Sequence, residues 1–168
     1  MASVDADDLV RFGQLVRRYV DVVDGDVAGI DLLRQLRIAL GDLYAMALHQ
    51  PAPPRSERSG HLELVSNAKK GAVAASLERR LPSELYWSAL LPRNYADVGD
   101  LGVKTLADAL GTIYGWLAPG LGLLGKTGSD KELQQWWFEW EAYWGSPAVR
   151  CIAILHEVIV DLEMYARP

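Results

Sequence analysis

The strongest constraint on the fold is the helical spacing of apolar residues at the start of the chain. Between positions 9 and 23, apolar side chains recur every three or four residues, while charged and amide side chains occupy the opposite face. A second stretch, about 27–49, repeats the pattern, and Gly25 lies between the two. Such spacing is typical of amphipathic helices that bury one face. Because the connection is short, we predict an antiparallel helical hairpin.

A proline-rich polar segment follows this hairpin. Residues 50–61 contain three prolines and are predicted to form a surface loop rather than a domain boundary. We expect a weaker helix over about 62–81, interrupted by Gly71, and then a short helix over 83–91 that Pro92 stops.

The next helix has the strongest apolar stripe of the chain. It is predicted from about 100 to 117 and is expected to be ended by Pro119 and Gly120. Gly111 and Gly115 lie four residues apart on its flank, which indicates the close approach of a neighbouring helix rather than a ligand.

The C-terminal part of the chain predicts two more helices. Ser129 or Asp130 can cap the first, which is expected to run to about residue 144 and to be closed by Gly145. Pro147 suits the first turn of the last helix, which is predicted to run to about residue 165. No stretch shows the alternation of a strand. We therefore predict an all-α fold, a single-domain bundle of about six or seven helices over residues 1–168.

Composition narrows the class of protein. The chain has 168 residues, half of them hydrophobic, which is the size of one domain with a sizeable core. A net charge of −5 argues against a dedicated nucleic-acid binder. The sequence shows neither a secretory leader nor an apolar stretch long enough to span a membrane, so we expect a cytoplasmic, bacterial protein with no membrane partner. Cys151 sits among apolar residues and is interpreted as a core residue.

The stretch GLGLLGKT, residues Gly120 to Thr127, matches the phosphate-binding loop pattern at every required position. A true loop of this kind joins a buried strand to the N-terminus of a helix. Here a helix precedes it, and the next capping residue comes only after Gly128. We therefore interpret the stretch as a glycine-rich connection, and a nucleotide site there as the less favoured alternative.

The stretch QQWWFEWEAYWG is the most unusual part of the chain. Wound as a helix, it places Trp136, Trp137, Trp140 and Trp144 on one side and Phe138 on the other. We interpret the tryptophans as core residues, since large rings dominate burial. The alternative is an aromatic cleft that holds a ligand.

Polar residues near this stretch are the candidates for chemistry. Glu139 belongs to the aromatic helix, and Glu157 follows His156 in the last helix. We interpret His156 as a buried or half-buried residue that hydrogen-bonds a neighbour, with a base or a metal ligand as the alternative. The chain lacks the second histidine of a zinc helix, so neither a metal nor a cofactor is predicted.

Three segments carry a resemblance to a known family. SELYW…LLP, TLADALGTIYGWLAPGLGLL and WWFEWEAYWG…AILHE resemble an uncharacterised bacterial family catalogued as DUF 5063. The resemblance covers about Leu85 to Glu157 and implies a helical fold with a loop at the glycine stretch. The family often has histidines near the Trp-Gly pair, whereas this chain has Tyr143 before it and Pro147 after it. The resemblance implies no activity.

These observations favour a non-enzymatic helical protein that acts through protein–protein contacts, with a protein partner or as a homodimer. Phe138 and Trp116, aromatic residues off the core stripes, are the candidate contact residues. The alternative is a small-molecule binder or hydrolase with an aromatic cleft. The candidate residues of that cleft are Glu139, Trp140, Trp144, His156 and Glu157.

Overall fold

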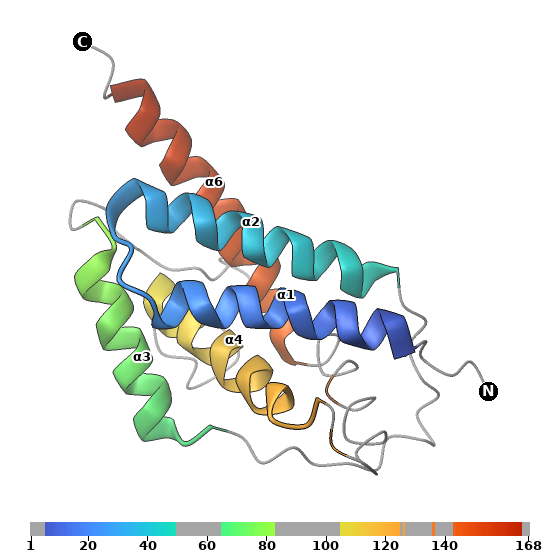
Figure 1. Cartoon of the computed structure of the whole chain (residues 1–168). Helices are drawn as coiled ribbons and strands as arrows, with labels where there is room; N and C mark the ends of the chain where they lie inside the picture. The colour runs from blue at the N-terminus through green and yellow to red at the C-terminus, as the bar shows by residue number, and fades with distance from the viewer. Residues whose placement is uncertain are drawn as a thin grey trace, which may run out of the picture.

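The computed structural model of the chain describes residues 6–49, 65–82, 105–124, 126, 136 and 143–165. These residues contain five α-helices and no strand, which confirms the all-α prediction, although six or seven helices were expected (Figure 1). The helices are α1 (Ala6–Asp24), α2 (Gly29–Leu48), α3 (Asn67–Arg80), α4 (Leu106–Leu121) and α6 (Gly145–Tyr165). The predicted loop at 50–61 and the predicted helix at 83–91 lie outside the described residues.

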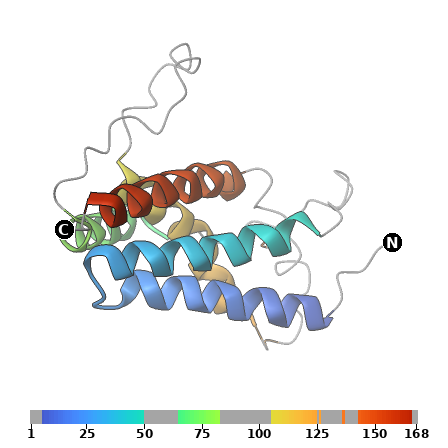
Figure 2. The same ribbon diagram turned by 90° about the horizontal axis from the view of Figure 1, so that it is seen from above.

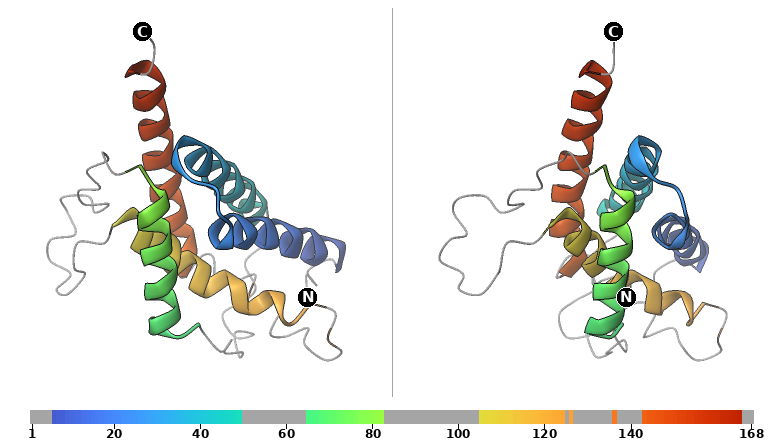
Figure 3. Two further views of the ribbon diagram at one scale, coloured as in Figure 1. Left: turned by 60° about the vertical axis from the view of Figure 1, so that its left-hand side comes forward. Right: turned by 90° about the vertical axis from the view of Figure 1, so that its left-hand side faces the viewer.

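Four of the helices enclose the core. α1 and α2 form the predicted antiparallel hairpin, α6 packs against α2, and α4 packs against both α1 and α6 (Figure 2). α3 lies on the outer side of α4. The C-terminal end of α6 rises clear of the other helices (Figure 3). The outer sides of α2 and α6 are therefore neighbouring surfaces that no other described helix covers.

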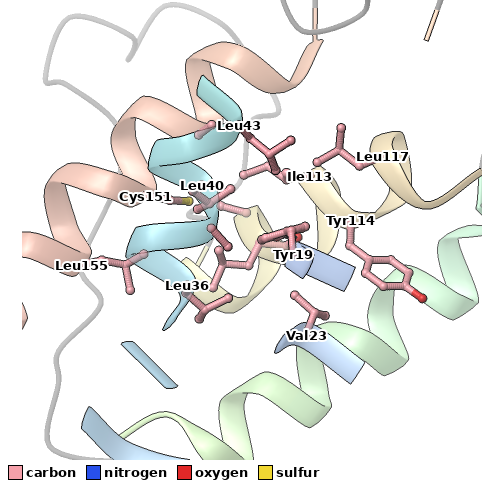
Figure 4. Packing of buried hydrophobic residues seen from close by; sticks show 14 of the residues in the cluster. Tyr19, Val23, Leu36, Leu40, Leu43, Ile113, Tyr114, Leu117, Cys151 and Leu155 are labelled. Atoms are coloured by element: carbon pink, nitrogen blue, oxygen red, sulfur yellow. Dashed lines mark hydrogen bonds between the residues drawn. The ribbon is translucent and has the colours of Figure 1, made fainter. Parts of the chain in front are cut away.

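The core is built from the apolar stripes that the sequence predicts. Tyr19 of α1 and Ile113 of α4 meet leucines of α2, and α6 contributes Cys151 and Leu155 (Figure 4). The Tyr19 hydroxyl donates a hydrogen bond of 2.8 Å to the Leu110 carbonyl oxygen inside this core. Burying a hydroxyl without a partner is costly, so this bond fixes the side of α4 that faces α1.

The turn between α1 and α2 is held by α3. The Arg80 guanidinium donates hydrogen bonds to the carbonyl oxygens of Gly25 (2.6 Å), Val22 and Val27 (both 3.4 Å), and also to that of Val23. A cation at a helix C-terminus is attracted to the negative end of the helix dipole. It also donates hydrogen bonds to carbonyl groups that have no partner within the helix. Gly29 begins α2 with φ +64°, a backbone conformation that favours glycine.

Two helix boundaries differ from the predictions. α3 runs through Gly71 without a break, because Ser66 caps its start by accepting a hydrogen bond from the Lys69 backbone N–H, and α3 packs along α4. α4 begins at Leu106 instead of about residue 100. Thr105 and Asp108 form a capping box at this point, with two reciprocal hydrogen bonds of 3.1 Å.

Two predicted stops are also wrong. α4 continues past Pro119 to Leu121: the proline has no N–H to donate, but the carbonyl oxygens of Pro119 and Gly120 accept backbone hydrogen bonds from Gly122 and Leu123. Gly145 does not end a helix: residues 143 and 144 form a π-helical turn that leads directly into α6, and Gly145 is the first residue of α6. Pro147 lies in the first turn of α6, as predicted.

The expected close approach at Gly111 and Gly115 is confirmed. A Cβ atom on Gly111 would lie 3.1 Å from the Lys70 carbonyl oxygen, and one on Gly115 would lie 2.4 Å from the Lys70 side chain. The two glycines thus let α3 pack closely on α4.

Candidate functional site

Trp136 and Trp144 belong to the core, as predicted. Both side chains are fully buried and meet Phe12 of α1. Trp136 contacts the Phe12 ring edge to face, with ring centroids 4.9 Å apart, and Trp144 stacks on it at 6.2 Å. The Trp136 indole Nε1 donates a hydrogen bond of 3.0 Å to the Leu117 carbonyl oxygen. The positions of Trp137 and Trp140 lie outside the described residues.

The first glycine of the phosphate-loop pattern serves this tryptophan packing. Gly120 is buried in the last turn of α4, and a Cβ atom there would lie 2.0 Å from the Trp136 ring. Three backbone N–H groups of the stretch also donate to backbone carbonyls: Gly122 to Pro119, Leu123 to Gly120 and Lys126 to Leu123. A phosphate loop needs such groups turned toward the ligand. This geometry therefore gives no support to nucleotide binding at 120–127.

His156 and Glu157 are exposed on α6, whereas Trp144 is buried at its start. His156 lies twelve positions after Trp144, which corresponds to about 18 Å along the helix axis. The structure thus does not bring these candidates together in one cleft. Glu139 and Trp140, the other cleft candidates, lie outside the described residues.

His156 hydrogen-bonds a neighbour, as expected, but it is exposed and not buried. A nitrogen of the Arg37 guanidinium lies 3.2 Å from the imidazole Nδ1. Because a guanidinium can only donate, Nδ1 accepts, and the proton of the neutral ring lies on Nε2. The Arg34 guanidinium makes a second link between α2 and α6, with a salt bridge of 2.8 Å to the Glu163 carboxylate.

Exposed apolar side chains also lie on these two helices. They form one row on α2 and another on α6, and each row has the spacing of a single helix face. We call these two rows the α2–α6 face: Ile38, Ala45 and Leu48 on α2, and Val149, Ala153, Val160 and Met164 on α6.

This clustering separates the α2–α6 face from ordinary surface. Eight large hydrophobic residues are exposed among the described residues, and five of them belong to the face. Met164 is 65% exposed and Leu48 is 55% exposed. Single exposed apolar side chains need no explanation, whereas a group of them on neighbouring helices is a candidate interaction surface.

A second, smaller surface involves the contact candidate Trp116. Its partly buried ring stacks on the exposed Tyr143 ring, with centroids 4.1 Å apart and planes within 6°. The Lys70 ammonium lies 5.8 Å from the Trp116 ring centroid. Trp116 is therefore occupied by contacts within the chain. Tyr143 was not singled out as a contact residue, and its place before Trp144 in the aromatic helix was the only signal for it. The position of Phe138 lies outside the described residues.

Two open grooves run between α1 and α2. One, of about 720 Å³, is lined by polar side chains that include Arg11, Asp42 and His49. The other, of about 530 Å³, lies beside Arg17 and Arg18. Neither groove reaches His156.

Burial raises the pKa values of three titratable side chains in the core. Burial raises the pKa of the Cys151 thiol to about 12. Burial and the neighbouring Asp24 carboxylate raise the pKa of Tyr114 to about 12, and burial raises that of Tyr19 well above its usual value. A thiol must ionise to act as a nucleophile, so the interpretation of Cys151 as a core residue is confirmed.

In the part of the chain that the structure describes, no three histidine, cysteine or acidic side chains form a group that could hold a metal ion. Within the same ranges, no helix is both long and apolar enough to cross a membrane.

Comparison with known proteins shows a similarity of fold and none of sequence family. No family model matches the sequence, and no curated protein is significantly similar to it. The crystal structure of protein BF1032 from Bacteroides fragilis, a structural-genomics target, is similar to this chain, with a TM-score of 0.67. The match covers 95% of this chain and 99% of that chain at 15% identity. At this identity the likeness shows the fold alone, and membership of DUF 5063 stays a prediction.

Proposed function

We propose that this protein is a non-enzymatic helical protein that binds another protein chain through the α2–α6 face. The observation that carries the proposal is the pair of exposed apolar rows on two neighbouring helices. Leaving such side chains in water costs free energy, which contact with a partner would recover at about 25 cal/mol for each Å² of apolar area buried.

The surroundings of the face also suit a protein contact. Arg34 and Arg37 link α2 to α6 beside the apolar rows, and His156 lies within the α6 row. Arginine is enriched in protein interfaces, where it accompanies apolar side chains.

The aromatic-cleft alternative has less support. Its described members divide between the core and the surface, and neither groove lies beside His156. The face on α2 and α6 therefore replaces Trp116 as the contact site that we favour, and Phe138 stays a candidate.

Site-specific photo-crosslinking in living cells tests this function. A benzophenone side chain at Val160 should give crosslinked protein products. The same group at Ala75, an exposed alanine on α3, should give few or none. If crosslinking is equally weak at the two positions, the α2–α6 face is not a contact surface. The mass of the product would also show whether the partner is a second copy of the chain.

A further inference from the structure

We infer that the partner on the α2–α6 face is a cationic amphipathic helix, whose apolar side packs on the α6 row and whose Lys or Arg side chains meet Glu157 and Asp161. The inference rests on the proposed function and adds to it the chemistry of the partner. It is argued from the apolar row of α6, from the open C-terminal end of this helix and from the charges beside the row.

The apolar row of α6 has a spacing that suits a helical partner. Val149, Ala153, Val160 and Met164 are all exposed and lie four, seven and four residues apart, so they share one side of α6. Helices that bind other helices use apolar side chains at such intervals. From Val149 to Met164 the row is about 22 Å long, which is the length of about 15 residues of a partner helix.

The row is most exposed at its C-terminal end. Met164 is 65% exposed, whereas Val149, at the other end, is 42% exposed. This end of α6 rises clear of the other helices (Figure 3). A partner helix therefore gains most of its apolar contact near Val160 and Met164.

Two carboxylates lie beside the row in the same half of α6. Glu157 follows Ala153 by four residues and precedes Val160 by three. Asp161 precedes Met164 by three residues. Residues three or four apart are neighbours on a helix surface, so each carboxylate adjoins the row. We call Glu157 and Asp161 the acidic edge. Both are exposed, and neither forms an ion pair with a residue that the structure describes.

The cations nearest to the acidic edge are already engaged within the chain. Arg150 lies on the same side of α6 two turns earlier, but it is half-buried and has an interaction of its own. Arg34 of α2 binds the Glu163 carboxylate, and Arg37 of α2 donates to His156. Among the described residues, the acidic edge therefore has no cation of its own.

The acidic edge is unfavourable for the chain alone. Like charges four residues apart on a helix repel each other. Carboxylates near a helix C-terminus also face the negative end of the helix dipole, and α6 has no basic residue in its last turn. A partner with Lys or Arg beside its apolar side would offset both effects, whereas an acidic partner or an anionic membrane surface would add to them. Charge complementarity therefore selects a cationic helix.

Fluorescence anisotropy of a labelled synthetic peptide, titrated with the full chain, tests the inference. The probe is a Leu/Lys peptide of about 18 residues, long enough to cover the row, with Leu at helical spacing and Lys elsewhere. We expect a Kd of about 10–100 µM and a gain of helical circular dichroism on binding. A peptide with Glu in place of every Lys should bind at least about tenfold more weakly. A scrambled Leu/Lys peptide should also bind more weakly, because it has no apolar side.

Charge reversals in the protein locate the contact. Glu157→Lys and Asp161→Lys should each raise the Kd of the Leu/Lys peptide about fivefold. Asp21→Lys makes the same change of net charge at an exposed carboxylate of α1, in the groove between α1 and α2. Its effect should stay within about twofold, because solvent and salt screen charges away from the contact. Thermal melting without peptide identifies a variant that fails to fold, and Glu157→Gln then takes the place of the reversal.

Three results would overturn the inference: no binding of the Leu/Lys peptide at about 100 µM chain, equally tight binding of the Glu peptide, or equal effects of Asp21→Lys and Asp161→Lys. Crosslinking at Val160 in cells separates these failures from a failure of the proposed function. A crosslinked partner segment rich in Lys or Arg, identified by mass spectrometry, would support both. An acidic segment, or the α6 helix of a second copy, would support the proposed function and overturn the inference.

Discussion

Gly120 is the position where one added methyl group would meet the most resistance. In Gly120→Ala, the new Cβ atom would lie 2.0 Å from two carbons of the Trp136 indole and 2.4 Å from its Nε1. Contacts below 3.0 Å are essentially never seen for a Cβ atom, so the indole or the helix would have to move by about 1 Å. The indole has little room, because it is fully buried, packed on Phe12 and bonded to the Leu117 carbonyl oxygen.

The expected loss of stability follows from three contributions. Overpacking a core typically costs about 1–3 kcal/mol. Displacing the indole weakens a hydrogen bond worth about 0.5–1.5 kcal/mol. Alanine in a helix recovers about 1 kcal/mol relative to glycine. The net loss is about 2 kcal/mol, which for a domain of this size lowers Tm by about 4–8 °C.

Thermal melting followed by circular dichroism measures this loss, and Gly71→Ala is the matched control. Gly71 is exposed within α3, and a Cβ atom there would meet nothing within 4 Å, so this change should stabilise the protein by about 0.5–1 kcal/mol. Trp136→Phe should reduce the cost of Gly120→Ala, since the smaller ring leaves space. A Gly120→Ala protein that melts at or above the parental temperature would refute this account of the glycine.

Two further predictions concern Arg80 and Cys151. Arg80→Ala should lower the free energy of unfolding, measured by urea denaturation, by about 2–3 kcal/mol, because the carbonyl groups at the end of α1 lose a charged donor; Arg80→Lys should recover only part of this. Burial raises the pKa of Cys151 from 9.0 to about 12, so the unfolded chain releases this proton at a lower pH than the folded chain does. The stability contributed by the protonated thiol is therefore complete below pH 9 and is lost as pH rises toward 12. Urea denaturation between pH 8 and 10 should show this decline, with a smaller slope in Cys151→Ala; equal slopes in the two proteins would contradict it.

The helices could be predicted because burial leaves a periodic trace in the sequence. The stripes of α1 and α2 follow directly from the spacing of apolar residues, and the end of α6 near residue 165 was also predicted. The close approach at Gly111 and Gly115 could also be predicted, because two glycines four residues apart leave one side of a helix without side chains.

The boundaries were harder, because local preferences competed with packing. Gly71 reads as a break, but the Ser66 cap and the contact with α4 outweigh a cost of about 1 kcal/mol. The start of α4 was available in the sequence, since Thr105 and Asp108 have the spacing of a capping box, and that signal was missed. Pro119 predicts a stop, but α4 continues through it to Leu121 and is held beyond it by backbone hydrogen bonds to the Pro119 and Gly120 carbonyl oxygens.

The candidate site shows the limit of periodicity. The pattern predicted a buried or half-buried His156 in the last helix but did not show which part of that helix meets water. The positions of α2 and α4 decide this: both pack against α6 and leave Val149 and Val160 exposed. A contact between segments so far apart in sequence leaves no local signal.

The contribution of α6 to the core also bears on how the chain folds during synthesis. α1 and α2 are synthesised before α6. Their apolar stripes pack against Cys151, Leu155 and Ile159, which follow the end of α2 by about a hundred residues. Until α6 emerges, the leucines of α2 have no partner from that side. Nascent hydrophobic surface of this kind is prone to aggregate and is what chaperones bind. The N-terminal hairpin therefore has to wait for α6 before its burial is complete, and the speed of translation between them sets the length of that wait.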